Sequence, residues 1–196
     1  DHYELTNYKE GSSPIKGDFQ SGMDKYNDYI KTAKLCMENN LDNYLKLIKD
    51  KNYSVILTAG SQSSKLYFSE NQKKLLKELN IDIDAFLKDS EYGNNLAYVS
   101  DTLETKGQPV NVSNEEDRYA TQVINEGGQF SDGTSFTMNI TGALCSVRVD
   151  NNNCGDVYGE LMNIVVYNKK TKKVIDTVSL RNNSYGSVSI GRKGKG

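Results

Sequence analysis

The stretch Leu161-Met-Asn-Ile-Val-Val-Tyr-Asn-Lys-Lys-Thr-Lys-Lys-Val-Ile-Asp-Thr-Val-Ser-Leu180 decides the fold. Its first part, residues 162–167, is almost continuously β-branched or aromatic, which predicts a strand covered on both faces. Its second part, residues 174–180, alternates in character and predicts a half-buried strand with Val174, Val178 and Leu180 on one face. The lysine-rich residues between the two parts predict a turn. The stretch is therefore interpreted as a β-hairpin within a sheet.

Helical and strand patterns are segregated along the rest of the chain. Apolar residues recur at helical spacing over 23–38 and 41–48, and Ser69 is a candidate N-cap for a further helix. The spacing of Tyr26, Tyr29 and Tyr44 indicates core positions. Strands are expected at 53–59 and 94–100, and after residue 118 at 118–125, 134–141, 144–149 and about 185–190. This order predicts an α+β or α/β chain, a β-β-α sandwich with helices packed on a mixed sheet.

Residues 107–117 are the best candidate for a linker, because they contain Gly107, Pro109 and three acidic residues. They separate a helical half, residues 1–106, from a β-rich hairpin half, residues 118–196. We expect the two halves to form one compact module.

Composition excludes several function classes. The net charge is −2 and charges of both signs are interspersed, which argues against nucleic-acid binding. No apolar run approaches the roughly 20 residues of a membrane span. His2 is the only histidine, so a catalytic triad and a site with several histidine ligands are both excluded. We expect no metal, no cofactor and no enzymatic activity.

The cysteines leave two alternatives open. Cys145 and Cys154 have a spacing that would let a disulfide bridge a hairpin-like loop. Alternatively all three cysteines are free thiols, with Cys36 on an apolar helical face.

Two further stretches match one family together with the hairpin. Residues 43–59, a loop and residues 73–80 look like a helix–strand–loop–helix core, and Asn182-Asn-Ser-Tyr-Gly-Ser-Val-Ser-Ile-Gly-Arg-Lys-Gly194 looks like a closing strand. Together these motifs resemble the interleukin-like EMT inducer, or PANDER-like, domain family. The family occurs in secreted and cell-surface proteins, including bacterial ones. The resemblance implies a β-β-α sandwich that binds a β-linked sugar without catalysis.

The resemblance comes with departures. The hairpin follows the helical half here but precedes it in the family, which indicates either a permuted module or a slice through a tandem array; the start at Asp1 looks processed or cut. Glu160 and Leu161 stand where the family has arginine and glycine. The loop at 59–63 lacks the family's acidic residue.

The first functional hypothesis is a non-catalytic, extracellular or cell-surface carbohydrate-recognition module that binds a glycan or cell-surface polysaccharide. Its candidate ligand-binding residues offer hydrogen-bonding groups and an aromatic face, with Arg192 as an additional candidate: Ser61, Gln62, Ser63, Arg181, Ser184 and Tyr185. The basic residues from Arg192 onward are also a candidate contact for an acidic polymer.

Two other classes are open. One is a protein–protein interaction or spacer domain in a surface assembly. The other is a glycosidase that uses Asp101 with Glu115 or Glu116, since such enzymes need two carboxyl groups across a cleft.

Overall fold

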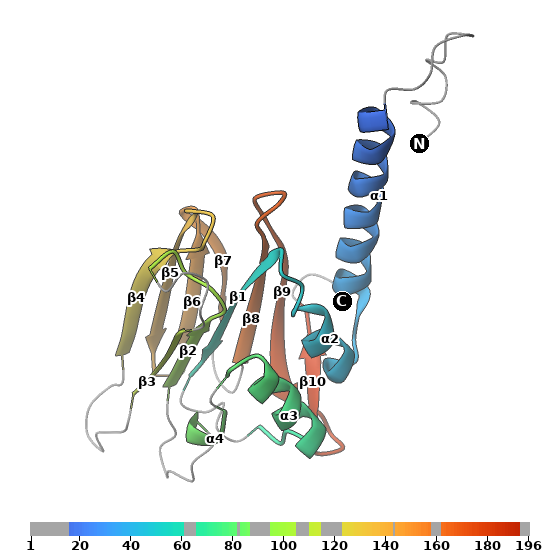
Figure 1. Cartoon of the computed structure of the whole chain (residues 1–196). Helices are drawn as coiled ribbons and strands as arrows, with labels where there is room; N and C mark the ends of the chain where they lie inside the picture. The colour runs from blue at the N-terminus through green and yellow to red at the C-terminus, as the bar shows by residue number, and fades with distance from the viewer. Residues whose placement is uncertain are drawn as a thin grey trace, which may run out of the picture. The chain divides into compact units, whose positions relative to one another are not determined.

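The computed structural model describes residues 16–60, 66–81, 83–86, 95–104, 110–114, 123–142, 144–157 and 162–192. The chain divides into two compact units, Asp1–Met37 and Glu38–Gly196. The first contains the long helix α1 (Lys16–Met37), and the second contains the other helices and the strands (Figure 1). Within the expected linker at 107–117, residues form strand β3 (Val110–Asn114), which pairs with β2.

The second unit is built on two antiparallel sheets. The larger has the order β10-β9-β8-β1-β2-β3, and the smaller has the order β4-β5-β6-β7. Besides β3, their strands are β1 (Tyr53–Ala59), β2 (Asn95–Val99), β4 (Val123–Gln129), β5 (Ser135–Thr141), β6 (Leu144–Val149), β7 (Asn152–Val157), β8 (Met162–Asn168), β9 (Lys173–Asn182) and β10 (Val188–Gly191). Every described pairing is antiparallel, so the larger sheet is not of the expected mixed type. It joins strands from both expected halves into one module.

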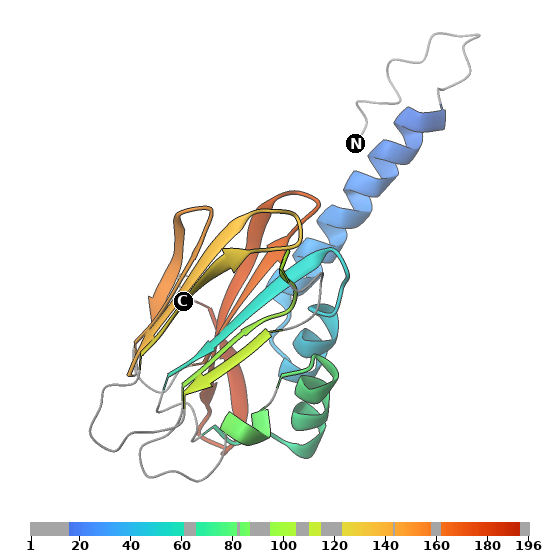
Figure 2. The ribbon, with the colours of Figure 1, turned by 60° about the vertical axis from the view of Figure 1, so that its left-hand side comes forward.

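The larger sheet is the middle of three layers. Both faces of its central strands are covered, and all seven residues of β8 are buried, which confirms the prediction for residues 162–167. Ile56 and Val165 belong to a core cluster with Met138 and Val147 of the smaller sheet. The alternate residues, such as Leu57 and its neighbour Ile164, point to the opposite face. The chain is thus an α+β protein with β-β-α layering (Figure 2).

Two helices of the second unit begin with side-chain caps. The helix α2 (Leu41–Leu47) starts after Asn40, whose Oδ1 accepts from the backbone of Asn43. The helix α3 (Glu70–Glu78) has the predicted N-cap Ser69, which forms a capping box with Gln72.

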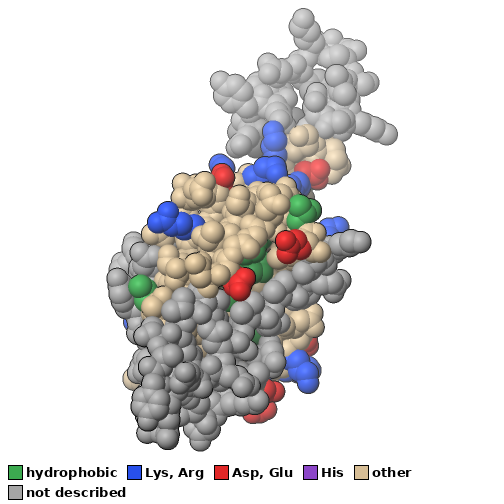
Figure 3. Space-filling model, turned by 90° about the vertical axis from the view of Figure 1, so that its left-hand side faces the viewer, with side chains coloured by type: hydrophobic (Ala, Val, Ile, Leu, Met, Phe, Trp, Pro, Cys, Tyr) green, Lys and Arg blue, Asp and Glu red, His purple; other side chains and the backbone are tan. Residues whose placement is uncertain are grey.

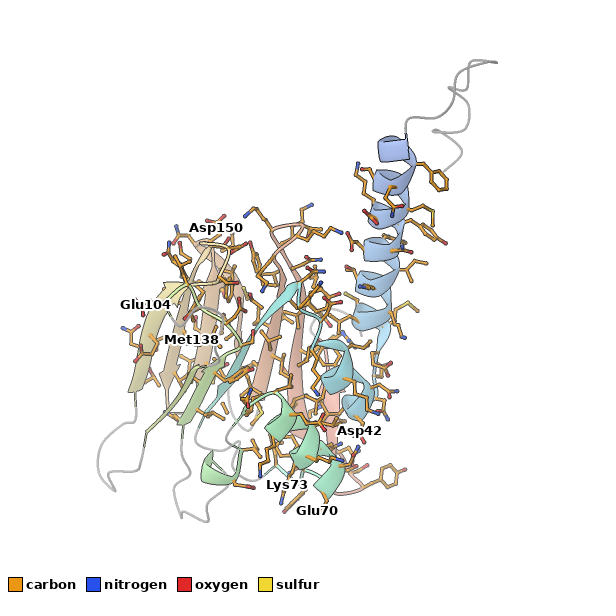
Figure 4. All side chains as sticks on the ribbon, in the orientation of Figure 1. Asp42, Glu70, Lys73, Glu104, Met138 and Asp150 are labelled. Carbon is orange, nitrogen blue, oxygen red and sulfur yellow. The ribbon has the colours of Figure 1, made fainter. Side chains whose placement is uncertain are left out.

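The two helices are linked to each other and to the sheet. Asn71 of α3 donates to Asp42 of α2 over 2.7 Å; Figure 4 labels Asp42 beside α3. The hydroxyl of Tyr98 in β2 donates to the carbonyl of Leu79 at the end of α3 over 2.7 Å. A short helix, α4 (Ile83–Phe86), follows.

A β-bulge changes the expected faces of β9. Asp176 pairs with Val166, but the next partner, Tyr167, pairs with Val174, so Ile175 is the extra residue. Val178 and Leu180 are buried, whereas Val174 is 37% exposed. The prediction that Val174 shares their face is wrong because alternation is interrupted at the bulge.

Of the two alternatives for the cysteines, the structure has the free thiols: Cys145 and Cys154 are not bonded to each other. Cys145 is opposite Val157 in the β6–β7 register, so Cys154 lies three residues further along β7. At about 3.3 Å per residue this is a displacement of about 10 Å, whereas a disulfide needs Cα atoms within about 7 Å. Burial raises the pKa of the Cys145 thiol to about 11, so it stays protonated at neutral pH.

Candidate functional site

The smaller sheet has a solvent-facing side made mostly of uncharged polar side chains. Along β5, buried and exposed residues alternate strictly, with Phe136, Met138 and Ile140 turned into the core. The described side chains that share the solvent side, as the register places them, are called the outer face: Asn125, Gln129, Ser135, Thr137, Asn139, Thr141, Leu144, Ser146, Arg148 and Asn153. Arg148 is the only charged residue of these ten, in a chain that is 26% charged, and the backbone of Asp156 in β7 pairs with Ser146.

Strand register arranges the outer face in rows. Asn125, Asn139 and Ser146 form one row across three strands. The adjacent row contains Gly127, Thr137 and Arg148. Rows follow from a strand spacing of about 4.8 Å and an outward-facing residue about every 6.8 Å along each strand. The result is a flat grid of amide and hydroxyl groups that can both donate and accept hydrogen bonds.

Gly127 leaves a gap in this grid, because it has no side chain to cover its neighbour. A Cβ placed there would lie 3.5 Å from Cγ2 of Thr137, in ordinary contact distance. Figure 3 views the molecule from the side of the smaller sheet, where described side chains of neither the charged nor the hydrophobic type predominate. Such a face suits a neutral ligand rich in hydroxyl groups.

The predicted residues Arg181, Ser184 and Tyr185 lie together on the β9–β10 hairpin. The turn is held by Asn183, whose Oδ1 accepts from the backbone of Tyr185 over 2.9 Å and of Ser187 over 3.1 Å. Tyr185 is 92% exposed on this turn. The hairpin therefore presents an aromatic ring on a hydrogen-bonded support.

A second exposed aromatic residue lies near the hairpin. The backbone of Tyr67 donates to Oδ1 of Asn182 over 2.9 Å, and Tyr67 is 63% exposed. Sequence reasoning missed it, although Leu66 and Phe68 on either side are buried and their alternation was the available signal. The other three predicted ligand-binding residues, Ser61, Gln62 and Ser63, lie outside the described residues.

Arg192 is not a ligand-binding residue as expected. Its guanidinium pairs with Asp176 over 3.1 Å and donates to Asn39 over 3.0 Å. It also lies over the ring of Tyr44, 5.6 Å from the centroid. Its side chain is 9% exposed, so neither a sugar nor an acidic polymer has access to it. The prediction failed because Asp176 and Asn39 are distant in sequence.

A shallow cleft of about 480 Å³ lies beside the start of β1, and four of its charged groups form two ion pairs. Lys49 and Glu78 form an ion pair of 2.6 Å across it. Asp101 pairs with Lys169 over 3.2 Å and accepts from the hydroxyl of Ser131. The cleft thus has no pair of free carboxyl groups among the residues that line it.

The environment of Asp101 opposes a general-acid role. Burial raises the pKa of its carboxyl group, but the Ser131 hydrogen bond and the charge of Lys169 outweigh burial and hold the pKa below its ordinary value. A general acid needs the opposite shift. Glu115 and Glu116, the expected partners, lie outside the described residues.

Asp132 has a similar structural role at the same end of the sandwich. It accepts from the hydroxyl of Tyr167 over 2.8 Å and from the backbone of Thr134 over 2.9 Å. Because Asp132 follows β4 and Tyr167 belongs to β8, the contact ties the two sheets together. These carboxylates stabilise the sandwich.

The described residues contain no cluster of histidine, cysteine or acidic side chains that could hold a metal ion. Among the helices they form, none combines the length and the apolar character required to cross a membrane. No family model, curated protein or solved structure matches the chain.

Proposed function

We propose that the protein is a non-catalytic carbohydrate-recognition module, and that a neutral glycan binds the outer face of the smaller sheet. The observation that supports this most is the row of Asn125, Asn139 and Ser146 beside Gly127 and Thr137. Planar amides and hydroxyls in register offer paired donors and acceptors to sugar hydroxyls. Because these groups are neutral, covering them with a ligand avoids the larger cost of removing water from a charged group.

The family resemblance supports the same proposal independently of the outer face. The β-β-α layering is the fold that the resemblance implies, and the β8–β9 hairpin that carries its motifs is central to the larger sheet. We accordingly propose an extracellular or cell-surface location within a larger surface protein, with a glycan or cell-surface polysaccharide as the ligand. We also propose that the chain is either a permuted module of this family or a slice through a tandem array of such modules.

The β9–β10 hairpin is the competing location for the same ligand, because Tyr185 could stack on a sugar ring while Arg181 donates to its hydroxyls. Two variants distinguish the locations. Asn139→Ala removes an amide from the middle of the outer face, and Tyr185→Ala removes the exposed ring. Neither side chain is buried, so neither change should lower stability by more than about 0.5 kcal/mol.

The experiment is a glycan-array screen of the full chain with neutral oligosaccharides, followed by calorimetric titration of the best ligand. We expect Asn139→Ala to weaken binding roughly tenfold, the value of about one lost hydrogen-bond pair. Asn27→Ala, an exposed asparagine of α1, is the matched control and should bind normally. Loss of binding in Tyr185→Ala alone would move the site to the hairpin, and absence of binding to every glycan would contradict the proposed function.

A further inference from the structure

The helix α1 has a line of exposed apolar side chains with a regular spacing. Phe19, Met23, Tyr26, Ile30 and Met37 are 64%, 41%, 57%, 46% and 75% exposed. With Ala33 between the last two, their separations alternate between four and three residues over the whole described helix. These six residues are called the α1 stripe. A 4-3-4-3-4 spacing is that of the contact seam between two coiled helices.

The α1 stripe differs from the side of the helix that is already buried. Leu35 is fully buried, and at 3.6 residues per turn it lies on the opposite side of α1 from Ile30 and Met37. Burial at Leu35 therefore does not account for the stripe. The expectation that Tyr26 and Tyr29 are core residues is wrong, since both are more than half exposed. The sequence has the apolar spacing of a packed helix here, but the side chains at these positions are exposed.

Charges beside the α1 stripe discriminate between possible arrangements of two helices. Asp24, Lys31 and Lys34 lie along the same flank of the stripe, with the acid toward the N-terminus and the lysines toward the C-terminus. In a parallel pair this flank would face the other flank of the partner helix, which carries Lys25 and Tyr29, so Asp24 would not meet Lys31 or Lys34. In an antiparallel pair centred near Asp28, Asp24 of each copy lies opposite Lys31 and Lys34 of the other.

We propose that α1 pairs in antiparallel fashion with α1 of a second copy of this chain, through the α1 stripe. The helix supplies both halves of the interface, since the stripe is complementary to itself and Asp24 lies opposite Lys31 and Lys34 in the antiparallel arrangement. The resulting dimer presents two copies of the second unit. The inference is independent of the proposed glycan site, although a dimer would bind a polymeric ligand with two sites.

The test measures the self-association of the full chain by sedimentation equilibrium over a range of concentrations. We expect a monomer–dimer equilibrium that Tyr26→Glu and Ile30→Glu weaken roughly a hundredfold or abolish, because each places two charges inside the dimer seam. Ser21→Glu introduces the same residue on the exposed side of α1 away from the stripe and should dimerise normally. Far-UV circular dichroism checks that each variant retains the helix.

Charge reversal tests the antiparallel orientation and does not depend on the stripe variants folding. Asp24→Lys should weaken dimerisation roughly tenfold. Adding Lys31→Asp and Lys34→Asp to Asp24→Lys should restore dimerisation. In a parallel pair Lys31→Asp and Lys34→Asp would not rescue Asp24→Lys, because Asp24 would not lie opposite these lysines.

Three results would overturn the proposal. They are a wild-type chain that stays monomeric at every concentration, a dimer that is unaffected by both stripe variants, and a monomer that instead binds lipid vesicles through the α1 stripe. Loss of glycan binding has no bearing on this test, so the two proposals fail separately.

Discussion

The helices α1 and α2 are both amphipathic, yet only α2 has its aromatic side chain enclosed. Tyr44 of α2 is fully buried, whereas Tyr26 of α1 is 57% exposed. Tyr44 donates to Asp176 over 2.9 Å, and Arg192 lies over its ring. Asp176 and Arg192 come from the other end of the chain. Amphipathic spacing thus identifies the apolar side of a helix, while distant residues determine whether that side is covered.

The surroundings of Tyr44 show what full cover requires. The side chains of Asp176 and Arg192 are 8% and 9% exposed, and they satisfy each other and the tyrosine hydroxyl. A buried ion pair is costly to form, because both groups lose their water. Its retention beside a buried aromatic ring holds α2 at one position on the sheet. The α1 stripe has no comparable polar anchor among the described contacts of its residues.

The largest expected effect comes from truncating the two tyrosines in parallel. Tyr44→Ala should lower the free energy of unfolding by about 3–5 kcal/mol, because it leaves a cavity and removes a partner of Asp176. Tyr26→Ala should change it by less than about 0.5 kcal/mol. Urea unfolding followed by circular dichroism, at a concentration where the chain is monomeric, measures both. Equal losses would show that α1 is enclosed in solution and would remove the difference between the helices.

Acid should act on the sandwich through Asp101. Its pKa is lowered in the folded protein, so its contribution to stability is present above the unfolded value of about 3.9 and is lost as pH falls through the folded value. Asp101→Asn should cost about 2 kcal/mol at neutral pH, since it weakens the contacts to Lys169 and Ser131.

The same substitution should also flatten the pH dependence of stability between about pH 5 and the folded pKa. Unfolding midpoints across this range provide the measurement. Asp84→Asn, an exposed position in α4, is the control and should follow the wild-type profile. A wild-type profile for Asp101→Asn as well would show that the carboxylate does not join the sheets in solution.

Local signals predicted what depends on neighbouring residues. The double cover of β8 follows from a nearly continuous apolar run, and the start of α3 follows from Ser69 and Gln72 three residues apart. The bulge at Ile175 did not follow, because the strand pattern on both sides of it is regular and only the pairing with Tyr167 reveals the extra residue.

The candidate site divides in the same way. The bounds of strand β5 were predicted to within one residue, and its alternation already indicates which residues face solvent. Thr137 and Asn139 nevertheless resemble ordinary strand residues in the sequence. Only the register shows that Asn139 lies beside Ser146. Arg192 was assigned to a ligand because nothing near it in sequence indicates Asp176 or Asn39. Sites assembled across strands need the register, which sequence spacing does not provide.

The smallest expected effect comes from a single hydroxyl, and it sharpens the comparison of covered and exposed tyrosines. Burial raises the pKa of the Tyr98 phenol well above its ordinary value, so the hydroxyl stays protonated and donates to Leu79 throughout the alkaline range of a stability measurement. Tyr98→Phe should cost about 1 kcal/mol, because the Leu79 carbonyl loses its donor where the helix α3 ends. Tyr29→Phe removes the same atom from a ring that is 72% exposed and should cost nothing measurable. The urea midpoints of the two variants measure the contribution of the Tyr98 hydrogen bond. If Tyr98→Phe is as stable as Tyr29→Phe, packing alone holds α3 on the sheet and the hydrogen bond to Leu79 adds no stability.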